Sequence, residues 1–167
     1  MPPPGDPGDP ARPAGPAGPA GPAGEQPPSR IDALLDAVRA GLGGRLAPQA
    51  AAVAQREGAL LVDIRYAALR DRDGTVPGAL IVERNELEWR LDPTCPHRSP
   101  AATGFGLRIV VLCNEGYASS LAARSLRELG LHRATDLVGG FQAWRAAGLP
   151  LVPPVRAAEA DRPTLET

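Results

Sequence analysis

Residues 108–119 read RIVVLCNEGYAS, and this stretch decides the fold class. Its first part, Arg108–Leu112, has four consecutive apolar side chains, all β-branched or leucine, after the arginine, which predicts a buried strand. The segment Ser119–Leu129 carries apolar residues on one side and stops at Gly130, as an amphipathic helix does. A strand that passes through a short loop into a helix is typical of an α/β fold.

The flanking sequence repeats this alternation of strands and helices. Apolar runs at 59–64, 79–82 and 134–138 predict three further strands. Helices are expected at 86–91, ahead of a proline, and at 141–147, ahead of a glycine. Because helices separate the strands, we expect the strands to run parallel in one sheet.

Two short amphipathic helices are expected ahead of the first strand. Ser29 is a good N-cap for a helix that ends at Gly41 and carries apolar residues at helical spacing. Pro48 suits the first turn of a second helix that runs to Arg56. Residues 71–74, Asp-Arg-Asp-Gly, are interpreted as a turn.

Proline and glycine divide the chain into parts. Residues 1–28 hold 11 of the 20 prolines and 6 of the 19 glycines, which predicts a disordered tail, since its few Gly-Pro-Ala triplets cannot sustain a collagen-like stem. Residues 29–152 are expected to form one domain, with helices at 29–57 and the core at 59–150. Residues 153–167 are expected to be a flexible tail.

The charge balance excludes several functions. Eighteen basic and nineteen acidic residues give a net charge of −1 without a basic block, so nucleic acid and anionic membranes are not expected as partners. All the basic residues are arginine, which excludes Schiff-base lysines and P-loop lysines. No apolar segment is long enough to span a bilayer or to direct export, so a cytoplasmic location is expected.

Cys113 follows the best strand directly, at the edge where reactive groups collect in parallel sheets. A tight loop of this length can turn backbone N–H groups toward the sulfur, with Gly116 supplying a positive φ. The helix N-terminus behind the loop adds partial positive charge. These effects favour a nucleophilic thiolate. The same loop, as a cradle of backbone N–H groups around the sulfur, would also stabilise a persulfide. The alternative is that Cys113 is a small buried hydrophobe.

Four motifs occur together in the chain. They are LVDIR at 61–65, GTVPGA at 74–79, CNEGYAS at 113–119 and LVGGFQAW at 137–144. In this order and at this spacing, over roughly residues 45–150, they resemble the rhodanese-like domain family. The resemblance implies an α/β fold with a central parallel five-stranded sheet flanked by helices.

The resemblance also implies a sulfurtransferase with Cys113 as its catalytic residue. Such an enzyme moves a sulfane sulfur from thiosulfate or a persulfide to a thiol or to cyanide. It needs no cofactor and no metal, and its partners are a small-molecule donor and a thiol acceptor, with an acceptor protein left open. The active-site loop then contains Asn114, Glu115, Gly116, Tyr117, Ala118 and Ser119.

The chain departs from the family at the loop. Many rhodaneses have a basic residue where this chain has Ala118, and Glu115 would repel an anionic donor. We therefore expect thiosulfate to be a poor donor and a persulfide to be a better one. Arg84 follows a strand and could hold the donor in place of the absent cation. The alternative is a surface ion pair with a neighbouring glutamate.

Other polar residues have structural interpretations beside functional ones. Asp63 and Arg65 end a strand at the same edge, and they either support the Cys113 loop or form a local ion pair that stabilises the fold. Cys95 lies in a polar loop and could resolve an oxidised Cys113, although the bystander interpretation is favoured. A metal site from these cysteines and the histidines is not expected, because no C-x-x-C pair occurs.

Two other functions compete with sulfur transfer as interpretations of this sequence. One is a rhodanese-like binding or regulatory module without turnover, which Ala118 favours and the presence of Cys113 opposes. The other is a cysteine phosphatase of the Cdc25 type, which needs an arginine six residues after the cysteine to clamp phosphate. Position 119 is serine, so the phosphatase is rejected.

Overall fold

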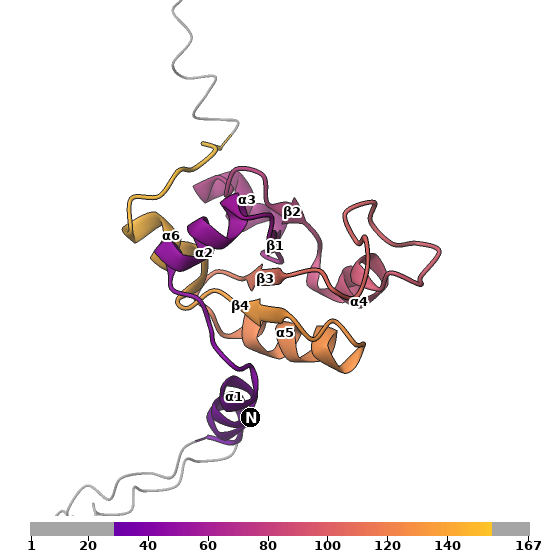
Figure 1. Ribbon diagram of the computed structural model, residues 1–167. Coiled ribbons are helices and arrows are strands. Elements are labelled where there is room, and N and C mark those ends of the chain that lie inside the picture. The colour runs from indigo at the N-terminus through magenta and orange to yellow at the C-terminus, as the bar shows by residue number, and fades with distance from the viewer. Residues whose placement is uncertain (1–28, 155–167) are drawn as a thin grey trace, which may run out of the picture.

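The order of helices and strands follows the predicted alternation. A computed structural model describes residues 29–154 (Figure 1), so the predicted tail at 1–28 and almost all of the tail at 153–167 lie outside the described residues. The elements are α1 (Arg30–Gly41), α2 (Pro48–Arg56), β1 (Leu60–Asp63), α3 (Ala67–Asp73), β2 (Leu80–Ile81), a 3-10 turn η1 (Arg84–Glu86), α4 (Leu87–Leu91), β3 (Ile109–Leu112), α5 (Ala118–Glu128), β4 (Ala134–Asp136) and α6 (Gly140–Ala146).

The strands form one parallel sheet in the order β2-β1-β3-β4. The expectation of five strands is wrong for the described residues, because only four form there. Leu46 makes a single parallel bridge to Leu137 at the β4 edge. Its N–H donates to Asp136 O and its carbonyl accepts from Val138 N. A strand longer than this one bridge does not form here, because α2 already begins at Pro48.

The two faces of the sheet are covered by different helices. Side chains alternate along a strand, so Val111 of β3 faces a core shared with α1, α4 and α5, while Val110 faces a core shared with α2 and α6. Phe141 and Trp144 of α6 are fully buried in the second core. In the part of the chain that the structure describes, no helix has the length and apolar character needed to cross a membrane.

The N-terminal half contains one element that the sequence analysis missed. The predicted turn at 71–74 is the last turn of α3 and its cap, where Gly74 has a φ of 82° and donates its N–H to Arg70 O. Because α3 buries no residue, it carries no apolar periodicity that could have identified it. In α1, Leu35 and Val38 are buried, whereas Ile31 and Leu34 are exposed.

Candidate active site

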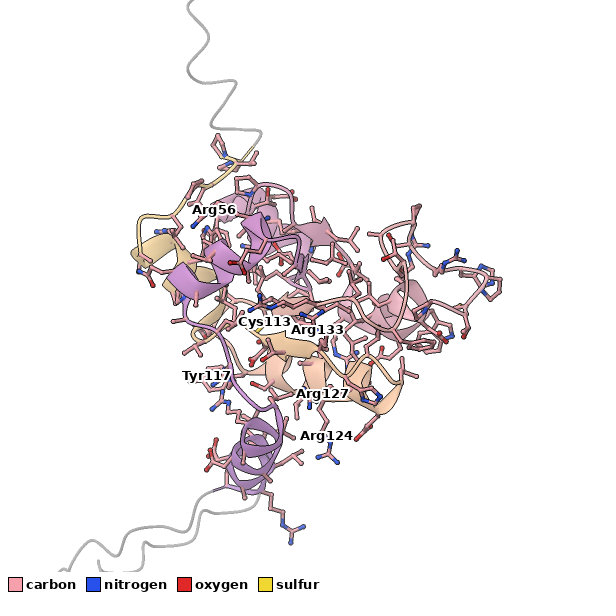
Figure 2. The ribbon with its side chains drawn as sticks, viewed as in Figure 1. Arg56, Cys113, Tyr117, Arg124, Arg127 and Arg133 are labelled. Carbon is pink, nitrogen blue, oxygen red and sulfur yellow. The ribbon has the colours of Figure 1, made fainter. Side chains whose placement is uncertain are left out.

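The Cys113 side chain lies at the carboxyl end of β3, inside the loop that leads to α5 (Figure 2). Its sulfur accepts hydrogen bonds from Gly116 N at 3.2 Å and Ser119 N at 3.4 Å. The Ser119 Oγ lies 3.3 Å from the same sulfur. The residue as a whole is 8% exposed, so the sulfur lies in a sheltered position. The loop therefore surrounds one sulfur atom with hydrogen-bond donors.

Further donors in the loop have no partner. Within residues 29–154, the backbone N–H groups of Glu115, Tyr117 and Ala118 donate to no protein atom. These three residues are exposed, whereas Gly116 and Ser119 are buried. The loop can thus offer N–H groups to a group that extends beyond the Cys113 sulfur.

Two glycines allow this loop to form. Gly116 has a φ of 81°, and a Cβ at this position would lie 2.7 Å from Gly139 N. A Cβ at Gly140, whose φ is 58°, would overlap the carbonyl oxygen of Cys113. Side chains are excluded at both positions by the close approach of backbone to backbone. The motif glycines at 139–140 therefore let α6 pack directly on the Cys113 loop.

The N-terminus of α6 holds the first part of the loop. Phe141 N donates to Cys113 O at 2.8 Å, and Gln142 N donates to Asn114 O at 3.0 Å. The Gln142 side chain also donates to Asn114 Oδ1 at 3.0 Å and to Asp73 Oδ2 at 3.3 Å. Hydrogen bonding from Arg72 is the main reason why the pKa of Asp73 falls from 3.8 to about 2, and the Gln142 amide contributes in the same direction.

A carboxylate that the sequence analysis missed holds the second part of the loop. Asp136, at the end of β4, is fully buried and accepts hydrogen bonds from Ser119 Oγ at 3.1 Å and Ser120 Oγ at 2.8 Å. Arg45 forms a bidentate ion pair with the same carboxylate, at 2.7 and 3.0 Å. An acidic residue in the strand predicted at 134–138 was the available sequence signal.

Two arginines contact the loop from the N-terminal segment. Arg39 of α1 donates to Gly116 O at 2.8 Å, and Arg45 donates to the same oxygen at 3.2 Å. The Arg39 guanidinium also lies 5.5 Å from the centre of the Tyr117 ring. Tyr117 is 56% exposed, so it is the side chain at the rim of the site. No motif in the sequence identified either arginine.

The structure separates the remaining candidate residues from the cradle. Arg65 pairs with Asp63 at 2.7 Å, donates to Gly74 O, and stacks 3.6 Å from the centre of the Phe141 ring. This is the local ion pair that was one of the two interpretations of Asp63 and Arg65 from the sequence. The pair reaches the loop only indirectly, through Phe141, whose N–H donates to Cys113 O. Arg84 pairs with Glu88 at 2.9 Å, so its guanidinium is engaged on the surface. This is the arrangement that the alternative interpretation of Arg84 describes.

The two cysteines are both free thiols, and Cys95 is partly exposed in the loop after α4. Among residues 29–154, no group of three or more histidine, cysteine, aspartate and glutamate side chains is arranged to hold a metal ion.

Parts of the chain are similar in sequence to known sulfurtransferases. A "Sulfurtransferase" of Allochromatium vinosum is 32% identical over 102 residues, which cover 61% of this chain and 86% of that protein. The adenylyltransferase and sulfurtransferase MOCS3-2 of Zea mays is 49% identical over 41 residues. That match covers 25% of this chain and only 8% of the maize protein.

A solved structure and a family model complete the comparison. A protein of unknown function from Rhodopseudomonas palustris CGA009, described as a possible tyrosine phosphatase, has a TM-score of 0.66 and 33% identity. The match covers 73% of this chain and 93% of that one. The model of the rhodanese-like domain family matches residues 47–147, which include all four motifs and the Cys113 loop. The chain therefore belongs to the rhodanese-like domain family.

Proposed function

We propose that the protein is a sulfurtransferase that carries a sulfane sulfur as a persulfide on Cys113. The observation that carries this proposal is the set of donors around Sγ, with Gly116 N and Ser119 N already bonded to it. Backbone N–H groups fixed around a sulfur favour its anionic forms, and they need no reorganisation during the reaction.

In the first half of the reaction, the Cys113 thiolate attacks the outer sulfur of the donor. A new S–S bond forms to Cys113 while the donor's own bond to that sulfur breaks, and the leaving group departs with the electron pair. The leaving group is sulfite if the donor is thiosulfate and a thiolate if the donor is a persulfide. In the second half, a thiolate or cyanide takes the outer sulfur and releases the Cys113 thiolate.

The loop donors divide between the two sulfur atoms of this intermediate. Gly116 N and Ser119 N hold the inner sulfur, and the unpaired N–H groups of Glu115, Tyr117 and Ala118 are available for the outer one. The Ser119 hydroxyl can turn its proton from Asp136 to the thiolate. Asp136 then keeps its bonds to Ser120 and Arg45, so this rotation leaves no buried carboxylate unpaired.

The exposed residues of the loop favour a persulfide donor. Ala118 offers no cation and Glu115 adds a negative charge at the rim, which opposes a dianion such as thiosulfate. We propose a low-molecular-weight persulfide as donor and a thiol, on a small molecule or on a protein, as acceptor. A free nucleophilic thiol suits the reducing cytoplasm, where we place this activity.

The chain is not proposed to be a phosphatase, although the similar Rhodopseudomonas protein is described as a possible one. Phosphate transfer needs a bidentate arginine clamp on the equatorial oxygens. In this loop the corresponding position is Ser119, which is fully buried and contacts the sulfur. Arg39 and Arg45 bond the loop through Gly116 O instead.

The proposal is tested by mass spectrometry of the intact protein after incubation with glutathione persulfide or thiosulfate. We expect the mass of one added sulfur atom, located on Cys113 by peptide mapping and removed by cyanide or a thiol. Cys113→Ser should remove the adduct, and Cys95→Ser, the matched control, should keep it. A wild-type protein that takes up no sulfur from either donor would contradict the proposal and favour the binding module.

The donor preference has its own test. Ala118→Arg places a cation at the rim, and a charge-assisted contact to thiosulfate should raise kcat/KM for thiosulfate about tenfold. The value for glutathione persulfide, which has no sulfonate oxygens beside the transferred sulfur for the guanidinium to bind, should change much less. If both donors respond equally, the charge at the rim does not determine the donor.

A further inference from the structure

We propose that Arg39 and Arg45 are positioning residues that lock the orientation of the peptide group between Gly116 and Tyr117. Both lie ahead of residues 47–147, the part that matches the family. The proposal rests on the function proposed above, because the locked peptide forms part of the cradle for the persulfide.

The contacts converge on a single carbonyl oxygen. Gly116 O accepts from Arg39 Nη2 at 2.8 Å and from Arg45 Nη2 at 3.2 Å. Ser120 Oγ also lies within 3.4 Å of this oxygen. Two guanidinium groups from outside the loop therefore bind the same backbone atom.

Both arginines are themselves held in place. Leu35 and Val38 bury one side of α1 against the core shared with α5, which fixes the helix that carries Arg39. The Arg39 Nε bonds Ser120 Oγ at 3.3 Å. The Arg45 side chain is 18% exposed and forms its bidentate pair with the fully buried Asp136. These anchors give the two guanidinium groups a fixed direction.

The orientation of the peptide follows from its planarity. In a trans peptide the carbonyl oxygen and the next N–H point in opposite directions. Because Gly116 O faces the arginines, the Tyr117 N–H faces away from them. The Gly116 N–H, on the preceding peptide, is bonded to the Cys113 sulfur. The arginines thus hold the loop in the arrangement that offers N–H groups to sulfur.

Glycine at position 116 makes such a lock necessary. Gly116 adopts a φ of 81° here, but glycine populates positive and negative φ about equally, so the loop can change its peptide orientations at low cost. A reversed 116–117 peptide would lose both arginine contacts and turn its carbonyl oxygen to the side that the Tyr117 N–H, proposed above as a donor to the outer sulfur, now faces. The negative end of that dipole would oppose a thiolate or a persulfide.

The charges also favour the locked form. Asp136 neutralises one of the two guanidinium charges, and the other, on Arg39, lies between the buried Gly116 O and the Tyr117 ring. The loop itself contains no basic residue and carries Glu115. Arg39 therefore supplies a positive charge to a loop that lacks one, and it reaches the loop through the carbonyl oxygen of Gly116.

The test compares Arg39→Gln, Arg45→Gln and the double variant with the wild-type protein. Arg30→Gln, on the exposed part of the same helix, is the matched control. The rate constant of persulfide formation at saturating donor is measured by quenched-flow mass spectrometry, together with the donor KM. Backbone amide NMR of Gly116 and Tyr117 reports the loop directly in the sulfur-free protein.

We expect Arg39→Gln to lower the rate constant about tenfold, as the loss of one charged hydrogen bond to Gly116 O implies, with KM changing less than about twofold. Arg45→Gln also breaks the ion pair with Asp136, so it should lower the rate constant at least as much and destabilise the fold as well. The Gly116 and Tyr117 amide resonances should shift, and the double variant should show the largest effects. Arg39→Lys should restore part of the rate, because an ammonium can still donate to Gly116 O. Arg30→Gln should behave as wild type.

Two results would contradict the proposal that Arg39 and Arg45 fix the orientation of the 116–117 peptide. One is a set of variants with wild-type rates and unshifted Gly116 and Tyr117 resonances. The other is a loss of rate that follows the loss of folded protein alone, with no recovery in Arg39→Lys. If the wild-type protein forms no persulfide, the proposed function fails, but the amide shifts still decide whether these arginines hold the loop.

Discussion

Replacing Gly116 by alanine tests whether the backbone contact between the Cys113 loop and α6 sets the shape of the site. The matched control is Gly58→Ala. Gly58 also has a positive φ, 94° against 81° for Gly116, but a Cβ there would meet nothing within 4 Å. A Cβ at Gly116 would lie 2.7 Å from Gly139 N and 3.2 Å from Gly140 N.

The two substitutions share one energetic cost and differ in the other. Both force alanine into the left-handed region, at about 1–2 kcal/mol. Only Gly116→Ala adds an overlap with backbone atoms, which cannot move aside as a flexible side chain can, and overpacking of this kind costs about 1–3 kcal/mol. The gain from a less flexible unfolded chain is similar in both and cancels. Gly116→Ala should therefore destabilise the protein by about 1–3 kcal/mol more than Gly58→Ala.

The assay is urea denaturation followed by circular dichroism, with the transition midpoints compared at a common m-value. Sulfur uptake by Cys113 is measured on the folded fraction of each variant. We expect Gly116→Ala to lose both stability and uptake, and Gly58→Ala to lose only a little stability. Equal destabilisation by the two variants, with equal sulfur uptake, would refute the argument that α6 shapes the loop.

Three further predictions follow from other contacts. Asp73→Asn should reduce the free energy of unfolding above about pH 5, because the folded-state pKa of Asp73 is about 2 and its ordinary value is 3.8. The difference from wild type should disappear as the pH falls from 4 to 2 in thermal unfolding. Arg65→Met leaves Asp63 buried without its partner and should cost about 3–5 kcal/mol in urea denaturation, with Asp63→Leu in the same chain recovering much of it. Ser119→Ala removes the hydroxyl beside the sulfur and should slow persulfide formation about 3- to 10-fold in quenched-flow measurements. It should also cost about 1–2 kcal/mol of stability, because the same hydroxyl donates to the buried Asp136.

The sequence predicted those elements whose apolar periodicity is strong. The second helix begins and ends at Pro48 and Arg56 as expected, because its start is fixed by proline and its buried face by regularly spaced alanines. The strand before Cys113 was predicted within one residue. By contrast, α3 packs no residue into the core, so its sequence could not reveal it.

The apolar runs predicted four strands, and the fifth strand, which is absent from the described residues, came only from the family resemblance. Leu46 reaches β4, but α2 begins two residues later and limits the pairing to one bridge. In the site, the motif located Cys113 and the residues of its loop. It could not locate Arg39, Arg45 or Asp136, because their roles arise from segments that the fold brings to the loop from far away in the chain.

The Cys113 loop therefore has an exposed face and a buried face, and the two faces contact different partners. Glu115, Tyr117 and Ala118 are exposed, on the side that we propose for the donor, whereas Gly116, Ser119 and Ser120 are buried against α1, β4 and α6. A substitution on the buried face changes the shape of the cradle for every donor. A substitution on the exposed face changes charge and size at the rim while the cradle keeps its anchors. Donor preference can thus diverge at the exposed positions without loss of the geometry that holds the sulfur.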